Sequence, residues 1–257
     1  MATPEYLAKL HPHERDSHIV FDEGPHIYHI DGDSSYTSVT KWNHSHFKPF
    51  NADLIIDKMM SSVRWSNSKY FGKSKQEIKN QWSQNGKTAS AAGTKLHYDI
   101  ECFWNQCSNE NSSIEYQYFL NFIIQFPIKP YRTEWMIWDK KYKLAGSVDF
   151  ISQNDDGTLT IYDWKRSKGI KKFNNYDSAI TPCINHLPDA NFWHYSLQLN
   201  TYKKIIENNY GLKVDKMYLV CLHPNKPNYQ RLEVPHLKSE MEELFQKREK
   251  YISQSML

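Results

Sequence analysis

The sequence contains few of the residues that mark several common classes of protein. Its four cysteines, at positions 102, 107, 183 and 221, form no Cys-x-x-Cys pair, which argues against a zinc ribbon or an iron–sulfur motif. No apolar run approaches the roughly 18 residues that a membrane helix needs. The N-terminus also lacks the apolar core of a secretory signal. We therefore expect reduced thiols, no membrane partner, and a protein that works inside a cell: in the cytoplasm, the nucleus or a virus- or phage-infected cell.

A strong excess of one charge is also missing. The formal net charge of +3 is too small to establish a nucleic-acid partner. Basic residues do gather in one segment, where five of them fall within eight positions. Alone, this cluster predicts a solvated basic loop; beside a phosphate-cleaving site it predicts contacts to phosphate groups. Its members are Lys165, Arg166, Lys168, Lys171 and Lys172.

The segment that precedes this cluster carries the strongest chemical signal. Residues 154–157, Asn-Asp-Asp-Gly, predict a tight β-turn, and a hairpin around it sets Asp149 opposite Asp163. Opposed Cβ atoms lie only about 4.5–5.5 Å apart, so the two carboxylates would repel each other unless a cation lay between them. Strand alternation places Lys165 on the same face as Asp163. Two acids and an amine on one face predict a divalent-metal site that cleaves phosphodiesters.

The chain shows no internal repeat and no low-complexity linker. We expect an α/β fold with a mixed sheet, because its centre alternates as helix, three strands, helix and strand. The expected domain is single and spans 1–257, with a mostly helical N-terminal portion (1–86), a core (87–224) and a C-terminal strand and helix (225–257). The predicted elements are a hairpin at 18–31; helices at 37–43, 52–63, 75–82, 88–106, 116–126, 192–208 and 237–252; and strands at 131–138, 143–152, 158–165, 214–222 and 230–234.

Three further groups of polar residues could complete the site. His97 and Glu101 are four residues apart on one predicted helix, so they share a face. Glu134 is an acid inside an apolar strand, and Gln198 and Tyr202 lie on a polar helical stripe. Each group alone has an ordinary interpretation: a hydrogen-bonded core histidine, an edge-strand carboxylate, or a solvated stripe. Their conjunction with the acidic hairpin favours a functional site.

Other histidines could suggest zinc, but their spacing does not. His44-x-His46 has no second pair at ligand spacing. We interpret His44 and His46, together with His11 and His13, as a solvated surface cluster.

The polar motifs occur in the order found in the PD-(D/E)XK nuclease superfamily, and the chain resembles its RecB-like exonuclease branch. That branch has the pattern G-x-x-x-H on a helix, then G-x-x-D, D-x-K and Q-x-x-x-Y. The resemblance covers residues 90–223. The matching residues are Gly93, His97 and Glu101; Glu134; Gly146 and Asp149; Asp163, Trp164 and Lys165; and Gln198 and Tyr202.

The resemblance implies a nuclease dependent on Mg²⁺ or Mn²⁺, built on a restriction-endonuclease-like core. Asp149, Asp163, His97 and the backbone carbonyl of Trp164 would hold the metal. Lys165 would orient or help to deprotonate the attacking water and stabilise charge on the phosphate. The iron–sulfur cysteines of some relatives have no counterpart here, so no cluster is expected. Glu101 and Glu134 could also hold metal, Glu101 in a supporting or second-metal role, and Gln198 and Tyr202 would steady the scissile strand or the lysine.

The leading hypothesis is a deoxyribonuclease of replication, repair or recombination, with exonuclease activity favoured. One alternative is a structure-specific endonuclease on the same fold. Another is a catalytically inactive module that binds nucleic acid. DNA is the expected partner, bound in part by Arg166, Lys168, Lys171 and Lys172. The sequence leaves open the strandedness of the substrate, the polarity of digestion, the number of metal ions and the oligomeric state.

Overall fold

The structure, a computed structural model, describes residues 4–255. The chain divides into two compact units. We call Met1–Lys48 with Leu96–Leu257 the sheet unit, and Pro49–Lys95 the helical unit. Each is described by itself.

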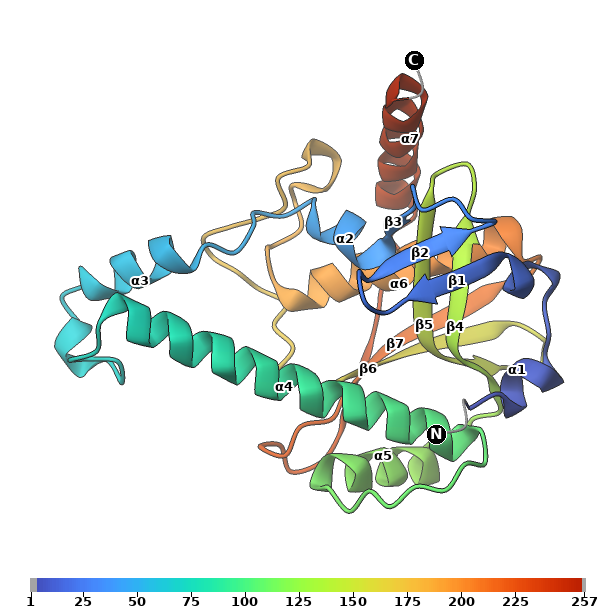
Figure 1. Cartoon of the computed structure of the whole chain (residues 1–257), viewed down its shortest axis with the longest axis horizontal. Coiled ribbons are helices and arrows are strands. Elements are labelled where there is room, and N and C mark those ends of the chain that lie inside the picture. Colours follow the sequence, from blue (N-terminus) through green and yellow to red (C-terminus); the bar gives the residue numbers. More distant parts are fainter. Residues whose placement is uncertain (1–3, 256–257) are drawn as a thin grey trace. The chain divides into compact units, whose positions relative to one another are not determined.

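A six-stranded mixed sheet organises the sheet unit, so the expected α/β fold class is confirmed (Figure 1). The strand order is β3-β5-β6-β7-β8, with β4 also paired to β5. The pairs β4–β5, β5–β6 and β7–β8 are antiparallel, whereas β3–β5 and β6–β7 are parallel. The strands are β3 (Thr37–Ser38), β4 (Pro130–Asp139), β5 (Leu144–Gln153), β6 (Leu159–Lys165), β7 (Val214–Cys221) and β8 (Gln230–Glu233). A separate hairpin pairs β1 (Ile19–Asp22) with β2 (Ile27–Ile30).

The central strand β5 is paired unevenly along its two edges. One edge is paired with β4 over residues 144–152. The other edge is shared, because β3 pairs with residues 144–145 and β6 with residues 150–153. Residues 146–149 lie between these two partners. Within residues 4–255 no strand pairs with this interval on that edge, and the interval contains Asp149.

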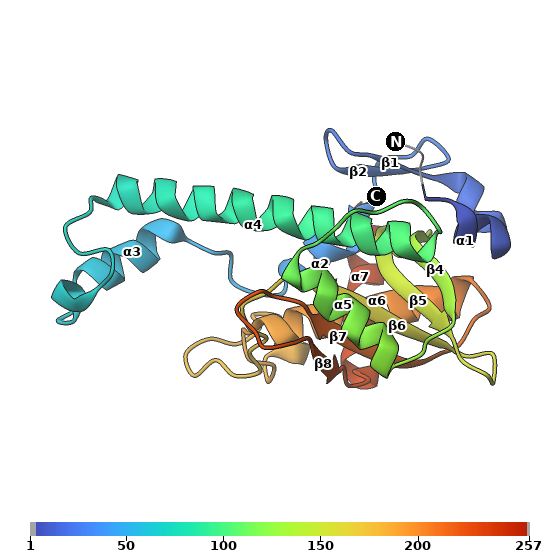
Figure 2. The same cartoon turned by 90° about the horizontal axis from the view of Figure 1, so that it is seen from below.

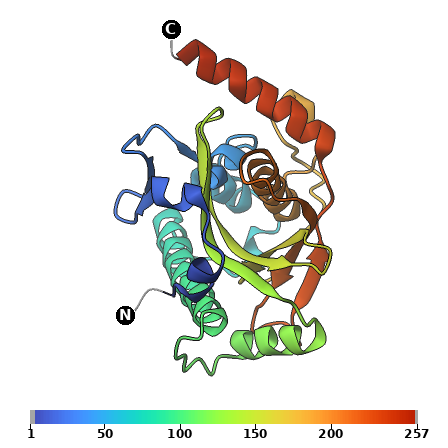
Figure 3. The same cartoon turned by 90° about the vertical axis from the view of Figure 1, so that its right-hand side faces the viewer.

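Helices cover both faces of the sheet (Figures 2 and 3). Side chains of α6 and α7 pack with Ile151, Ile161 and Leu219 into the larger hydrophobic core. Side chains of α5 and the last turns of α4 pack on the other face against Phe150 and Trp164. The helices are α1 (Tyr6–Leu10), α2 (Val39–His44), α4 (Lys75–Trp104), α5 (Ile114–Gln125), α6 (Asn191–Asn209) and α7 (Lys238–Ser255), with 3₁₀ turns at Glu14–His18 and Pro182–Ile184.

The helical unit comprises α3 (Ala52–Met60), a 3₁₀ turn at Trp65–Asn67 and the part of α4 up to Lys95 (Figure 1). Ile56 and Ile78 are fully buried. Lys75 forms ion pairs with Asp53 and Asp57. Two buried isoleucines and a network of surface ion pairs therefore contribute to the stability of this unit.

The sequence predicts two helices, at 75–82 and 88–106, where the structure has one. Helix α4 runs without interruption from Lys75 to Trp104. Asn85-Gly86 resembles a break, because glycine costs a helix about 1 kcal/mol relative to alanine. Residues 83–90 are all exposed, so this stretch carries no apolar stripe from which helix could be predicted.

The predicted solvated histidine cluster is wrong for His46. This side chain is only 8% exposed, packs edge-on against Trp42 and bonds Thr181 through Nδ1 at 3.0 Å. Burial lowers the pKa of His46 to about 4. The neutral imidazole therefore acts as a core residue.

The cysteines and the helices bear on the expected reduced thiols and on the membrane. All four cysteines are free thiols. Among residues 4–255, no helix combines the length and the apolarity that crossing a membrane requires.

Candidate metal centre

Three acids lie abreast on adjacent strands of the sheet. The register of β4 with β5 sets Glu134 across from Asp149. The register of β5 with β6 ends at Phe150 and Tyr162, and one further step sets Asp149 across from Asp163. Directly opposed residues point to the same face of a sheet. The predicted hairpin is present, and β4 adds a third carboxylate to its two.

The backbone at Glu134 adopts a left-handed conformation. Its φ is +41°, which a residue with a side chain adopts only at a cost of about 1–3 kcal/mol. Ser147 lies on the same face of β5 as Asp149, and its hydroxyl donates a hydrogen bond of 3.0 Å to Oε2 of Glu134. The backbone and the side chain of Glu134 are thus both held toward Asp149.

His97 comes to the acids from the end of α4. Its Nδ1 lies 3.7 Å from Oε1 of Glu134 and 3.6 Å from Oδ2 of Asp149. Its Nε2 lies 2.8 Å from the carbonyl oxygen of Trp164, and the amide of Trp164 donates to Oδ2 of Asp149 at 3.0 Å. One ligand atom from each of His97, Glu134 and Asp149 lies within 4.8 Å of the others. Hydrogen bonds to the β6 backbone orient two of the three.

Asp163 and Lys165 form a second, more deeply buried part of the site. Asp163 is 2% exposed, and Nζ of Lys165 lies 2.7 Å from its Oδ2. This contact is an ion pair, and by hydrogen-bond geometry neither buried carboxylate oxygen of Asp163 is satisfied within the described part of the chain. The ring of Tyr195 lies 4.6 Å from the Lys165 Nζ. The lysine therefore has an acid on one side and an aromatic ring on the other.

Helix α6 supplies the two remaining predicted residues. Gln198 donates a hydrogen bond of 3.1 Å from Nε2 to the hydroxyl of Tyr202. The Tyr202 ring passes so close to β5 that a Cβ atom on Gly146 would lie 2.8 Å from Cε1. The glycine of the Gly146-x-x-Asp149 motif is thus required by close packing against Tyr202, rather than by a turn.

Burial of the acids, and their negative charge acting on His97 and Lys165, raise the pKa values of the site. Burial raises the pKa of Asp149, and it raises the pKa of Asp163 to about 6. Burial and the charge of Glu134 raise the pKa of Glu101 to about 7. Burial would lower the pKa of His97, but Asp149 and Glu134 outweigh it and raise this pKa to about 9. The same balance holds for Lys165. Burial would lower its pKa, but the negative charges of Asp163 and Asp149 raise the pKa above its usual range.

These residues fit a divalent cation. Hard cations such as Mg²⁺ and Mn²⁺ take carboxylate and carbonyl oxygens, and one imidazole suits Mn²⁺ as well. A metal-bound histidine usually donates its other N–H to a carbonyl or carboxylate, which the Nε2 contact of His97 with Trp164 reproduces. The buried oxygens of Asp163, which receive no hydrogen bond from residues 4–255, are suited to a cation for the same reason.

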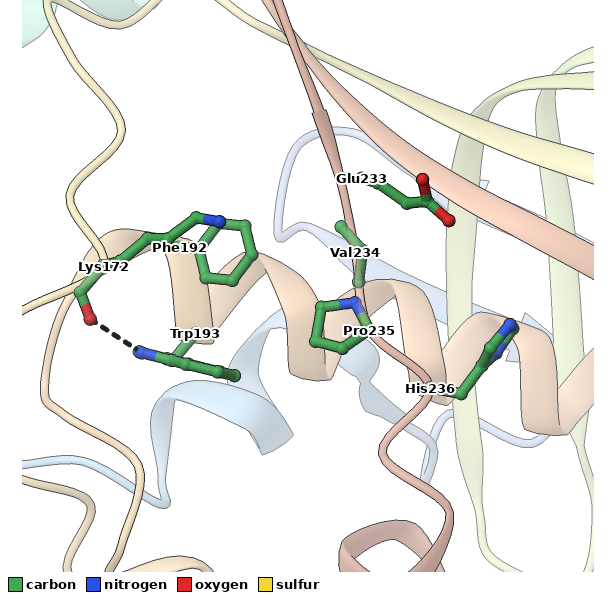
Figure 4. Close-up of a pocket in the computed structure, with 7 residues that line it drawn as sticks. All are labelled: Lys172, Phe192, Trp193, Glu233, Val234, Pro235 and His236. Carbon is green, nitrogen blue, oxygen red and sulfur yellow. Dashed lines mark hydrogen bonds between the residues drawn. The ribbon is translucent and has the colours of Figure 1, made fainter.

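The predicted basic residues occupy different environments. The Nε of Arg166 donates to Oε1 of Glu115 at 2.7 Å, so this guanidinium already has an acidic partner. Lys168 and Lys171 are exposed. Lys172 lies over the Phe192 ring and borders a pocket of about 420 Å³ (Figure 4). None of the acids described above lines that pocket, whose residues are Lys172, Phe192, Trp193, Glu233, Val234, Pro235 and His236.

Two residues of the site were not predicted from the sequence. Ser147 lies two positions before Asp149 on the same strand face, a spacing that could have identified it. Tyr195 lies three residues before Gln198 on α6. Its contact with Lys165 depends on how α6 packs against the sheet, and no local sequence pattern predicts it. Glu101, which was predicted, lies near His97 but outside the three-residue cluster.

No protein-family model and no curated protein matches the sequence. Among solved structures, the protein SSO0001 is similar, with a TM-score of 0.39 and 14% identity over 86% of this chain and 77% of that chain. A candidate exonuclease from Eubacterium rectale is also similar, with a TM-score of 0.34 and 11% identity over 86% of this chain and 79% of that chain. Both similarities are too distant to indicate an activity.

Proposed function

We propose that this protein is a divalent-metal-dependent deoxyribonuclease of the RecB-like type, with exonuclease activity, contained in a single nuclease domain. The observation that carries the proposal is the row of Glu134, Asp149 and Asp163 across three strands, with His97 and Lys165 beside it. Structural carboxylates are normally spread out or individually paired. Here the carboxylates converge, and the pKa values of Asp163 and His97 are raised. A site that takes up protons in this way has surplus negative charge that a metal cation would also neutralise.

In this proposal Glu134, Asp149 and Nδ1 of His97 hold the metal together with Asp163, while the Trp164 carbonyl orients the His97 ring by accepting from its Nε2. A bound Mg²⁺ or Mn²⁺ would lower the pKa of a water and neutralise charge on the phosphate. Lys165 remains protonated, because its pKa is raised. It would then donate to the phosphate oxygen on which charge develops.

The other residues position this chemistry. Tyr195 and Asp163 hold the Lys165 ammonium between them. The Tyr202 hydroxyl accepts a hydrogen bond from Gln198, and the Tyr202 ring packs against β5 at Gly146, which has no side chain. The exposed Lys168 and Lys171 would contact phosphates further along the strand.

The test uses end-labelled single-stranded and double-stranded DNA with Mg²⁺, Mn²⁺ or EDTA. We expect cleavage with either metal and none in EDTA. A covalently closed circular substrate separates the two nuclease modes, because an exonuclease needs an end. Cleavage that persists in the Asp163→Asn variant would contradict the proposal, as would a purified wild-type protein inert with every divalent ion.

A further inference from the structure

The positive charge of the chain is concentrated in the helical unit. Residues 49–95 contain eight Lys and Arg against three Asp and Glu, a net charge of +5. The remaining residues contain 24 Lys and Arg against 26 Asp and Glu, a net charge of −2. The small overall charge therefore conceals a strongly basic unit of 47 residues.

The three acids of this unit are already engaged. Asp53 and Asp57 pair with Lys75 and Lys79 at 2.8–3.2 Å, and Glu77 accepts hydrogen bonds from Ser74. Five further cations of the unit are exposed, and within the described structure no acidic side chain forms an ion pair with them. These five are Lys58, Arg64, Lys69, Lys73 and Lys87.

Aromatic rings lie among these cations. Trp82 contacts Phe50 and Tyr70, with ring centroids 6.1 and 6.0 Å away, and its indole N–H donates to the Tyr70 hydroxyl at 2.8 Å. Trp65 contacts Phe71 at 6.0 Å. Tyr70 and Phe71 are consecutive, so the two groups, five rings in all, adjoin along the chain. Phe50 is 74% exposed and Phe71 is 59% exposed, so the set presents apolar ring surface to solvent.

Charge and rings together specify the ligand. Rings that offer their faces bind bases by stacking, and cations between them neutralise phosphates. Lys69 lies directly over Tyr70, with Nζ 4.9 Å from the ring centroid. Duplex DNA conceals its base faces and would leave Phe50 and Phe71 unused. A protein partner complementary to this surface would have to be acidic, and a second helical unit would repel it at +5 against +5.

We propose that the helical unit binds single-stranded DNA on this surface, which we call the aromatic–basic surface: Phe50, Trp65, Tyr70, Phe71 and Trp82 with Lys58, Arg64, Lys69, Lys73 and Lys87. Binding itself requires no metal and no cleavage. It rests on the proposed function only in that the bound strand is the one delivered for hydrolysis.

The test measures fluorescence anisotropy of a labelled oligo(dT) with the full chain in EDTA, so that binding is separated from cleavage. We expect Phe71→Ala to weaken binding about 5- to 100-fold. We expect Lys69→Gln with Lys73→Gln to reduce the slope of log K against log salt by about 1.4. Val63→Ala is the matched control: this side chain is 98% exposed in the same unit but has neither ring nor charge, and its affinity should equal that of the wild type.

Three outcomes would overturn the proposal. They are an unchanged affinity in Phe71→Ala, equal affinity of the wild type for duplex and oligo(dT), and a change of oligomeric state in Phe71→Ala, by analytical ultracentrifugation, without a change in DNA affinity. Oligo(rU) in a parallel arm tests whether the sugar matters. Failure here leaves metal-dependent cleavage intact, whereas failure of the nuclease proposal leaves binding in EDTA intact, so the two results are distinguishable.

Discussion

The sheet unit and the helical unit use charge in opposite ways. In the sheet unit, acids are buried and brought together, and strain at Glu134 is tolerated to keep them so. In the helical unit, five exposed cations lie among rings, and the three acids are already engaged by neighbouring groups. Converging buried charge fixes a reaction geometry, whereas dispersed exposed charge attracts a polymer without fixing its position. We therefore expect variants of the two units to affect different steps.

The largest expected effect is that of Lys165→Ala on cleavage. Loss of a positioned charge donor to the phosphate should reduce kcat about 10²- to 10³-fold, while oligo(dT) affinity in EDTA stays unchanged because the helical unit is intact. Single-turnover cleavage and anisotropy on the same preparation measure both. A variant that lost affinity and kept its rate would reverse the assignment of roles to the two units.

Acid should remove the stability that the buried, neutral His46 contributes to the sheet unit. Burial lowers the pKa of His46 to about 4, below the value of about 6.5 that it has when unfolded. The stability that its neutral form contributes is complete above pH 6.5, and it is lost as pH falls from 6.5 toward 4, by about 3 kcal/mol. Residues 49–95 contain no histidine.

Denaturant unfolding at several pH values checks this expectation. The wild type should lose stability relative to His46→Gln across the window from pH 6.5 to 4, because glutamine cannot take up the proton. Hydrogen-exchange protection around His46 should fall between pH 7 and pH 5 in the wild type and change less in His46→Gln. Parallel pH profiles for the wild type and His46→Gln would be the contrary result.

Glu134→Gln should weaken metal binding about 10- to 100-fold, a range typical for the loss of groups that tune a metal site. The change removes one charge from the three-residue cluster and keeps the size of the side chain and the partner of Ser147. Calorimetry with Mn²⁺ measures the affinity without reference to cleavage. Glu77→Gln is the control in the helical unit, where the acid only caps Ser74, and equal losses in both variants would contradict a specific site.

Local pattern predicted much of this arrangement. The Asn-Asp-Asp-Gly turn and the alternation of β5 and β6 were sufficient to bring Asp149 and Asp163 together. The convergence of Glu134 was less certain from the sequence, because it depends on which strand neighbours β5. Strand order is set by long-range packing, which a single sequence does not encode in any short segment.

The remaining features depend on contacts between distant parts of the chain. The burial of His46 follows from its bond to Thr181, 135 residues away. Helix α4 continues through Gly86 because the exposed stretch 83–90 is flanked on both sides by residues that are themselves helical. Polar residues without periodicity are equally consistent with a loop, so sequence alone favoured a break there.

Two glycines provide the finest comparison between the units. In Gly146→Ala the new Cβ would meet Tyr202 at 2.8 Å, and we expect a loss of about 1–3 kcal/mol from overpacking, together with slower cleavage. In Gly86→Ala nothing lies within 4 Å, and the helix should gain about 0.5–1 kcal/mol. Thermal unfolding measures both free energies. If Gly146→Ala were as harmless as Gly86→Ala, Tyr202 would not be held tightly against β5, and its role in positioning the acids would be lost with it.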